Sequence, residues 1–237
     1  TSMVLVFVSI FALFLLNVFL GSVAIPFRSV WDILWHTGGY SEIWNNIVWK
    51  SRVPQTLTAL VAGAGLSISG LQMQTVCRNP LAGPSVLGIS SGASLGVAFI
   101  ILGTGFLPTF ISSFFLSNYG LVLASSLGSF LVLMAVLLVS QKLKDTMAIL
   151  IVGLMFGSFT SAIVSVLSYF TTAEKLQKFT FWSMGSISNL SWNEISLLSV
   201  FVIIGIGISF MVIKPLNALL LGEKYAQSIG INYKKTR

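Results

Sequence analysis

The sequence is short of charge. Only 19 of its 237 residues are charged, 13 basic and 6 acidic, which is 8% against roughly 25% in an ordinary soluble domain. A soluble globule of this length needs more charge to cover its surface, and a disordered chain combines high charge with low hydrophobicity. Because 55% of the residues are hydrophobic, the composition excludes both classes and predicts a membrane protein with several spans.

Cysteine and histidine are nearly absent. Cys77 is the only cysteine and His36 the only histidine. A disulfide framework is therefore excluded. A metal site needs three or four His, Cys or carboxylate ligands, and we expect no such cluster in this chain. The glycines at 63 and 65 lie inside a hydrophobic run, so they are not a phosphate-binding fingerprint. We expect no enzyme activity, no ATP hydrolysis by this chain, no cofactor and no metal.

The uncharged stretches locate the spans, since a helix crossing the membrane needs about 20 apolar residues. There are 25 uncharged residues between Arg52 and Arg78, and 63 between Arg78 and Lys142, enough for two helices. The fold class is predicted to be all-α, a polytopic transmembrane helical bundle. We expect the first span to be a retained helix, and the true N-terminus to lie before Thr1. The six predicted spans are 3–25, 54–76, 85–103, 119–140, 147–170 and 194–213.

No ionisable residue lies at the middle of any predicted span. Proton-driven transporters carry intramembrane carboxylates or histidines as relays, so their absence argues against a self-powered transporter. Six spans place both termini on one side of the membrane. If that side is cytoplasmic, the inner segments hold eight Lys or Arg residues and the outer segments five, a weak positive-inside bias.

Small residues recur every four positions on three predicted helices. Such stripes let helix backbones approach closely in lipid. We favour helix packing for each stripe, with a smooth pathway wall as the alternative, and we expect the fifth helix to line a translocation path. The stripes include Gly63 on the second helix, Gly88, Gly92 and Gly96 on the third, and Gly153, Gly157, Ser161 and Ser165 on the fifth.

Tryptophans gather in the segments between spans. Residues 26–52 hold Trp31, Trp35, Trp44 and Trp49, which is typical of an interfacial amphipathic stretch. Residues 171–192 carry Trp182 and Trp192 and are long enough for a short helix lying on the membrane.

Residues 51–97 contain a pattern that resembles one family closely. Two further segments agree, 181–186 and 216–230. The resemblance covers nearly the whole chain and is to the permease family of type II ABC importers for iron–siderophore complexes, haem and cobalamin. Its most specific block contains Gln74, Asn79, Pro80, Leu81, Ala82, Pro84, Leu87, Gly88, Ser91, Gly92 and Ala93.

The resemblance implies a multi-pass permease of the bacterial cytoplasmic (inner) membrane. Its implied partners are a second permease subunit, two cytoplasmic ATPase subunits and a periplasmic or lipid-anchored substrate-binding protein. Membrane lipid surrounds it, and no nucleic acid is implied. Family members have ten helices, so the transmembrane permease domain at 1–237 is expected to be the N-terminal part of the family fold.

The resemblance also assigns roles to single residues. The segment 216–230 resembles the coupling helices that dock on the ATPase, with Leu221, Gly222, Glu223, Ala226 and Gly230 as the contact residues. The alternative for this segment is an ordinary basic juxtamembrane tail.

Arg52 matches the first arginine of a pair that receives acidic residues of the binding protein, although Gln55 replaces the second. Its alternative role is a lipid-headgroup anchor. Asp145 and Thr146 resemble an inner gate, and Asp145 equally suits a helix N-cap.

The predicted function is therefore the permease subunit of an ATP-driven importer of a metal chelate. The alternative is a six-span secondary transporter or channel that is not coupled to an ATPase. The coupling-like tail distinguishes the two, because a channel needs no such segment.

Overall fold

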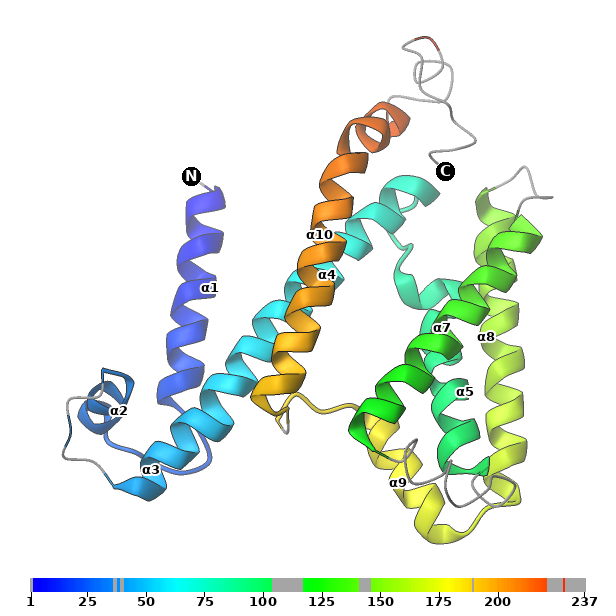
Figure 1. The fold of residues 1–237 in the computed structure, drawn as a ribbon. Coiled ribbons are helices and arrows are strands. Elements are labelled where there is room, and N and C mark those ends of the chain that lie inside the picture. The colour runs from blue at the N-terminus through cyan, green and yellow to red at the C-terminus, as the bar shows by residue number, and fades with distance from the viewer. Residues whose placement is uncertain are drawn as a thin grey trace. The chain divides into compact units, whose positions relative to one another are not determined.

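A computed structural model describes residues 2–35, 38, 41–103, 117–140, 146–188, 190–220 and 228. All regular elements within these ranges are helical (Figure 1), as the sequence predicts. The helices form two compact units, which are described separately. The first comprises 1–67 and 186–210, and the second comprises 68–185 and 211–237, so α4 and α10 contribute to both.

The first unit is organised around the end of α1 (Ser2–Phe19). A short helix α2 (Phe27–Leu34) follows, and α3 (Glu42–Ile47) continues through a π-helical turn (Val48–Arg52) into α4 (Val53–Cys77). Val18, Val30 and Val48 from these elements are buried together. The amphipathic stretch predicted at 26–52 thus contains two short helices and a turn that leads into a span.

The helix α10 (Trp192–Leu220) begins with a capping box. The Ser191 backbone N–H donates to a Glu194 carboxylate oxygen at 2.7 Å, and the Glu194 N–H donates to Ser191 Oγ at 3.4 Å. Each side chain thereby satisfies a backbone donor that the first helical turn leaves without a partner. The Trp192 Nε1–H donates to the Trp49 carbonyl at 3.0 Å, which ties this helix start to the π-helical turn.

The second unit packs α5 (Ile89–Ile101) against α7 (Asn118–Ser140) and α8 (Thr146–Tyr169). Figure 1 shows α9 (Ala173–Met184) at one end of these three helices. Phe179 of α9 is buried against Val97 and Ile101 of α5. The short helix predicted within 171–192 is therefore present, and it packs on the helical core of this unit.

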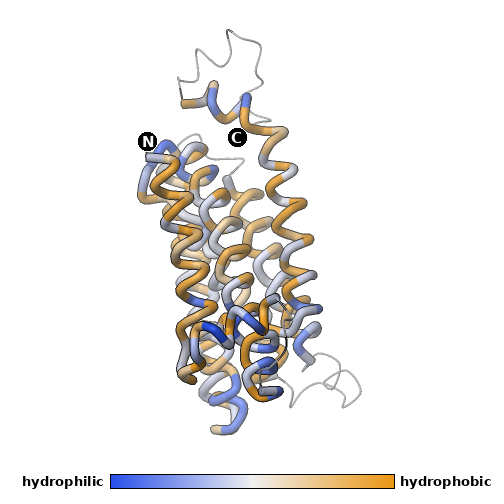
Figure 2. Tube along the Cα trace, turned by 90° about the vertical axis from the view of Figure 1, so that its left-hand side faces the viewer, coloured by the Kyte–Doolittle hydropathy of each residue, from blue (hydrophilic) through white to orange (hydrophobic). Residues whose placement is uncertain are grey.

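Within the described residues, five helical stretches are long and apolar enough to cross a membrane: Ser2–Phe19, Glu42–Cys77, Asn118–Ser140, Ala148–Tyr169 and Trp192–Ala218. Most of their surface is exposed apolar side chain, as a lipid-facing helix requires. Figure 2 shows this hydrophobic colouring along the long helices. Five of the six predicted spans correspond to these stretches.

The third predicted span, 85–103, is corrected by the structure. A 3₁₀ turn (Pro84–Leu87) occupies its start, and Gly88 then adopts a left-handed φ of 76° that separates the turn from α5. The remaining helix has 13 residues, about 20 Å at 1.5 Å per residue, which is short of the roughly 30 Å hydrocarbon core. Measuring the distance between charges could not reveal this interruption.

Candidate functional site

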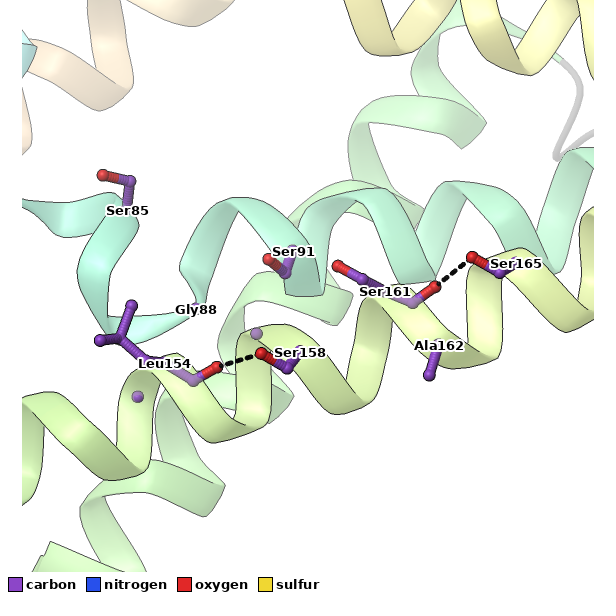
Figure 3. A pocket seen from close by; sticks show the side chains of 10 residues that line it. Ser85, Gly88, Ser91, Leu154, Ser158, Ser161, Ala162 and Ser165 are labelled. Atoms are coloured by element: carbon purple, nitrogen blue, oxygen red, sulfur yellow. Dashed lines mark hydrogen bonds between the residues drawn. The ribbon is translucent and has the colours of Figure 1, made fainter.

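An open groove of about 560 Å³ runs between the start of α5 and the length of α8. Figure 3 shows α8 contributing most of the wall and the 3₁₀ turn contributing Ser85. None of the lining residues is charged, and half of them are serines. The lining residues are Ser85, Gly88, Ser91, Gly153, Leu154, Gly157, Ser158, Ser161, Ala162 and Ser165.

The groove surface is polar without being ionic. Ser158 Oγ donates to the Leu154 carbonyl at 3.0 Å, and Ser165 Oγ donates to the Ser161 carbonyl at 3.0 Å (Figure 3). Both hydroxyls therefore satisfy their donor within α8 and still present oxygen lone pairs to the groove. Such a wall can accept hydrogen bonds from a passing solute, and it offers no nucleophile–base pair for bond chemistry.

The four residues that the sequence predicts on the translocation path all line this groove, in two different ways. Ser161 and Ser165 are exposed on it. Gly153 is buried, and a Cβ there would lie 2.6 Å from the Val86 carbonyl oxygen and 2.7 Å from Leu87 Cα. Gly157 is intermediate, with its nearest side-chain atom, Ser91 Oγ, at 3.4 Å from such a Cβ. Gly153 thus holds α8 against the 3₁₀ turn, while the serines form the accessible wall.

Backbone contact between α5 and α7 depends on glycine. A Cβ on Gly92 would lie 2.6 Å from the Gly128 carbonyl oxygen, and one on Gly96 would overlap the Ala124 carbonyl. Gly88 turns toward α8 instead, where a Cβ would lie 3.0 Å from the Gly153 carbonyl oxygen. The stripe on α5 therefore faces two neighbours, with Gly92 and Gly96 on α7 and Gly88 on α8.

Gly63 of α4 has a different environment. A Cβ added there would meet no atom of the described chain within 4 Å. Gly65 is the glycine of this helix that contacts α10, where a Cβ would lie 3.3 Å from Val202 Cγ2. The packing role of Gly63 stays a prediction, since nothing within the described residues packs on it.

Arg52 is enclosed by the end of α1. Its side chain is 5% exposed. Nη1 donates to the carbonyls of Val18 at 3.1 Å and Phe19 at 2.8 Å, and Nη2 donates to the Val23 carbonyl. The Val18 and Phe19 carbonyls belong to the last turn of α1, which leaves acceptors without intrahelical partners. The guanidinium therefore closes this helix end, and its positive charge suits that end of the helix dipole.

The docking role predicted for Arg52 stays a prediction; in the described chain its guanidinium is held by the end of α1. Thr56 lies one turn further along the same helix and supports the same junction. Its hydroxyl donates to Asn17 Oδ1 at 2.8 Å. Arg52 and Thr56 together join the start of α4 to the end of α1.

The predicted coupling and gate residues fall largely outside the described residues. Leu221, Gly222, Glu223, Ala226, Gly230 and Asp145 all lie there, as does the side chain of Thr146. The start of the predicted coupling segment is described: Leu216 and Ala218 of α10 are buried, with Val76 of α4 packed against them.

Two small residues of the helix crossing were missed from the sequence. Gly128 and Ala124 of α7 supply the backbone that Gly92 and Gly96 contact. A Cβ on Gly128 would overlap the Gly92 carbonyl oxygen and lie 3.0 Å from Gly96 Cα. The signal was present, because Gly120, Ala124 and Gly128 also recur every four residues.

The long apolar helices and their glycine-mediated packing define a polytopic helical membrane protein, with an uncharged groove beside one of the candidate spans. The model of the FecCD transport family matches residues 8–237, and the chain belongs to that family. The resemblance inferred from residues 51–97 and 216–230 is thereby confirmed.

Several known proteins are similar to this chain. The hemin transport system permease protein HmuU of Yersinia pestis is 32% identical over 224 residues, which cover 92% of this chain and 63% of HmuU. The vitamin B12 import system permease protein BtuC of Escherichia coli (strain K12 / DH10B) is 33% identical over 185 residues, 78% of this chain and 54% of BtuC. The chain thus spans between 54% and 63% of the length of these curated relatives.

One solved structure has the same fold. It is an inward-facing conformation of a metal-chelate type ABC transporter, with a TM-score of 0.77 and 27% sequence identity. The match covers 97% of this chain and 69% of the solved chain. The predicted all-helical transmembrane fold is confirmed by this match and by the five candidate spans.

Proposed function

We propose that this chain forms the N-terminal part of a permease subunit in an ATP-driven importer of a metal chelate, such as an iron–siderophore complex, haem or cobalamin. Membership of the FecCD transport family supports the proposal, as do the relatives that transport hemin and vitamin B12. The chain moves its substrate and leaves ATP hydrolysis to separate subunits.

The uncharged groove on α8 is the observation that carries the proposal. A bulky chelate must move along the wall without being held, and a charge in low dielectric would bind it tightly. The exposed hydroxyls of Ser158, Ser161 and Ser165 provide weak, exchangeable hydrogen bonds instead. This surface suits passage better than storage, and selection of the chelate then belongs to a separate binding protein.

The proposed partners are a second permease subunit, two cytoplasmic ATPase subunits and a periplasmic or lipid-anchored binding protein, in the bacterial inner membrane. Within 216–230, Leu221, Gly222, Glu223, Ala226 and Gly230 are the proposed contacts with the ATPase, and the small side chain of Ala226 allows a close approach. Asp145 and Thr146 form the inner gate at the start of α8. Changing Gly222 or Ala226 to Trp should abolish ATPase copurification, and retention of the ATPase would remove the coupling assignment.

Reconstituted transport tests the whole proposal. The protein, its ATPase and its binding protein are placed in proteoliposomes, and uptake of ferric siderophore, haemin and cobalamin is measured with and without ATP. We expect ATP-dependent uptake of one chelate that stops with a hydrolysis-deficient ATPase. Uptake driven by a proton gradient without ATP would instead support the uncoupled secondary transporter.

Cysteine accessibility tests the groove itself. In a Cys77→Ser background, Ser161→Cys and Ser165→Cys should react with a polar thiol reagent in the assembled transporter. Thr160→Cys is the matched control, because Thr160 is 2% exposed and should stay unreactive. Gly153 is unsuitable for labelling, since any Cβ there displaces α8. If neither serine position reacts, α8 does not line a water-accessible path.

A further inference from the structure

A stripe of aromatic side chains lies on the exposed side of α2. Phe27 is 66% exposed, Trp31 50% and Trp35 66%. These residues are four apart, so they share one helix face. Val30 and Ile33 on the other apolar side of α2 are fully buried. The helix therefore has one apolar face that is buried in its own unit and a second, aromatic face whose three side chains are half or more exposed.

The aromatic stripe continues the exposed surface of a membrane span. The rings of Phe19, the last residue of α1, and Phe27, the first of α2, stack with centroids 4.1 Å apart. The α1 side chains remain largely exposed, including Phe11 at 64% and Leu16 at 51%. Because α1 is long and apolar enough to cross the bilayer, its exposed apolar side chains are suited to contact with lipid. Phe19 also packs against the buried cluster of this unit, so the stacked pair places the start of the stripe directly beside the end of α1.

A cation borders the stripe at a defined place. At roughly 100° per residue, Phe27, Trp31 and Trp35 cover an arc of about 80°, and Arg28 lies about 20° beyond Trp35. Arg28 is exposed. An arginine beside exposed tryptophans matches the composition of the membrane interface, where the rings occupy the headgroup level. The guanidinium can bind a lipid phosphate in bidentate geometry.

We propose that α2 docks on the phospholipid interface, with Phe27, Trp31 and Trp35 among the glycerol groups and upper acyl chains and Arg28 on a lipid phosphate. The occupant is the lipid surface, because the stripe begins where α1, an apolar helix long enough to span the membrane, ends. In this position α2 anchors the C-terminal end of α1, which Arg52 caps, at the level of the lipid headgroups. This role is independent of the chelate importer function.

Tryptophan quenching by brominated lipids tests the proposal directly. The full chain and a Trp31→Phe/Trp35→Phe variant are reconstituted in phosphatidylcholine vesicles, and their difference spectrum isolates the emission of α2. Lipids brominated near the glycerol end of the acyl chain should remove roughly half or more of this emission, and lipids brominated near the methyl end should remove less. Phenylalanine keeps the stripe apolar, so the variant should fold, which size-exclusion chromatography checks.

A matched difference spectrum comes from Trp182→Phe. Trp182 is half-buried beside Phe179, with ring centroids 6.5 Å apart, so its emission should respond weakly to either lipid. Quenching of the α2 emission by aqueous acrylamide but not by bromolipid would place the stripe in water and overturn the proposal. Resistance to both quenchers would mean that a binding protein, another subunit or another segment covers it, which also overturns it.

The role of Arg28 is tested separately. Arg28→Glu should reduce quenching of the α2 tryptophans by the shallow bromolipid, because the carboxylate is repelled by phosphate and draws the helix outward. Arg28→Lys keeps the charge and should retain the quenching. Equal quenching in the glutamate and lysine variants would remove Arg28 from the docking contact.

Discussion

Replacement of Gly128 by alanine should separate α5 from α7. The added Cβ would overlap the Gly92 carbonyl oxygen and lie 3.0 Å from both Gly96 Cα and Gly96 N. All three atoms belong to backbone, so no flexible side chain can move aside and the helix axes must shift. Overpacking of this kind costs about 1–3 kcal/mol, and alanine returns up to about 1 kcal/mol of helix propensity.

The net effect of Gly128→Ala is therefore a destabilisation of about 1–2 kcal/mol, or a fall of roughly 2–8 °C in Tm for a chain of this size. Thermal unfolding in detergent, followed by size-exclusion chromatography, measures this change. Gly207→Ala on α10 is the matched control, since its Cβ would meet no atom of the described part of the chain within 4 Å, and the Tm of this variant should be unchanged or higher. A Tm for Gly128→Ala equal to that of Gly207→Ala would refute the close backbone contact.

Three further substitutions test the turns and the closed helix end. Arg52→Gln removes the charged group that donates to three carbonyls and should cost about 2–3 kcal/mol of stability, measured as a lower Tm. Lys50→Gln, at an exposed cation two residues away, is the control and should be nearly neutral. Equal losses of Tm in the two variants would contradict the role of Arg52. Gly21→Ala places a Cβ 2.9 Å from Arg52 Nε and should lower the Tm. The loss should be smaller in an Arg52→Gln background than in the wild type, because the crowded guanidinium is then absent. Additive losses of Tm would show that the two sites are independent. Gly88→Ala forces alanine into a left-handed φ of 76°, which should lower the stability by about 1–2 kcal/mol. Gly83→Ala, at a residue with a φ of −138°, is the control and should not lower the Tm. Matching Tm values for the two variants would exclude backbone strain at Gly88.

Charge spacing predicted the spans well because a lipid-facing helix excludes charge along its whole length. It failed at 85–103, where the interruption comes from one glycine in a left-handed conformation and no charge marks it. Gly63 and Gly96 look alike in sequence, because each belongs to a run of small residues spaced four apart. Their surroundings differ because contact depends on the neighbouring helix, which spacing within one helix does not specify.

The environment of Arg52 could not be predicted from local pattern either. Its carbonyl partners lie 29 to 34 residues earlier in the chain, and backbone carbonyls carry no sequence signal. The family resemblance assigned Arg52 to an outer surface by position alone. The structure adds that a π-helical turn directly before α4 directs this side chain toward the end of α1, and π-helical turns are frequent where side chains have specific tasks.

The same glycine contacts limit how the second unit can move. Gly153 brings the α8 backbone against Val86 and Leu87, Gly92 brings α5 against α7, and Phe179 attaches α9 to α5. Backbone-to-backbone contacts of this kind have few alternative arrangements, because close-packed interiors transmit strain instead of deforming. We therefore expect α5, α7, α8 and α9 to move as one rigid body, so that the groove keeps its shape while access to it changes. We expect motion instead at faces that lack such contacts among the described residues, such as the α4 surface around Gly63 and Gly70, where a Cβ would meet no described atom within 4 Å.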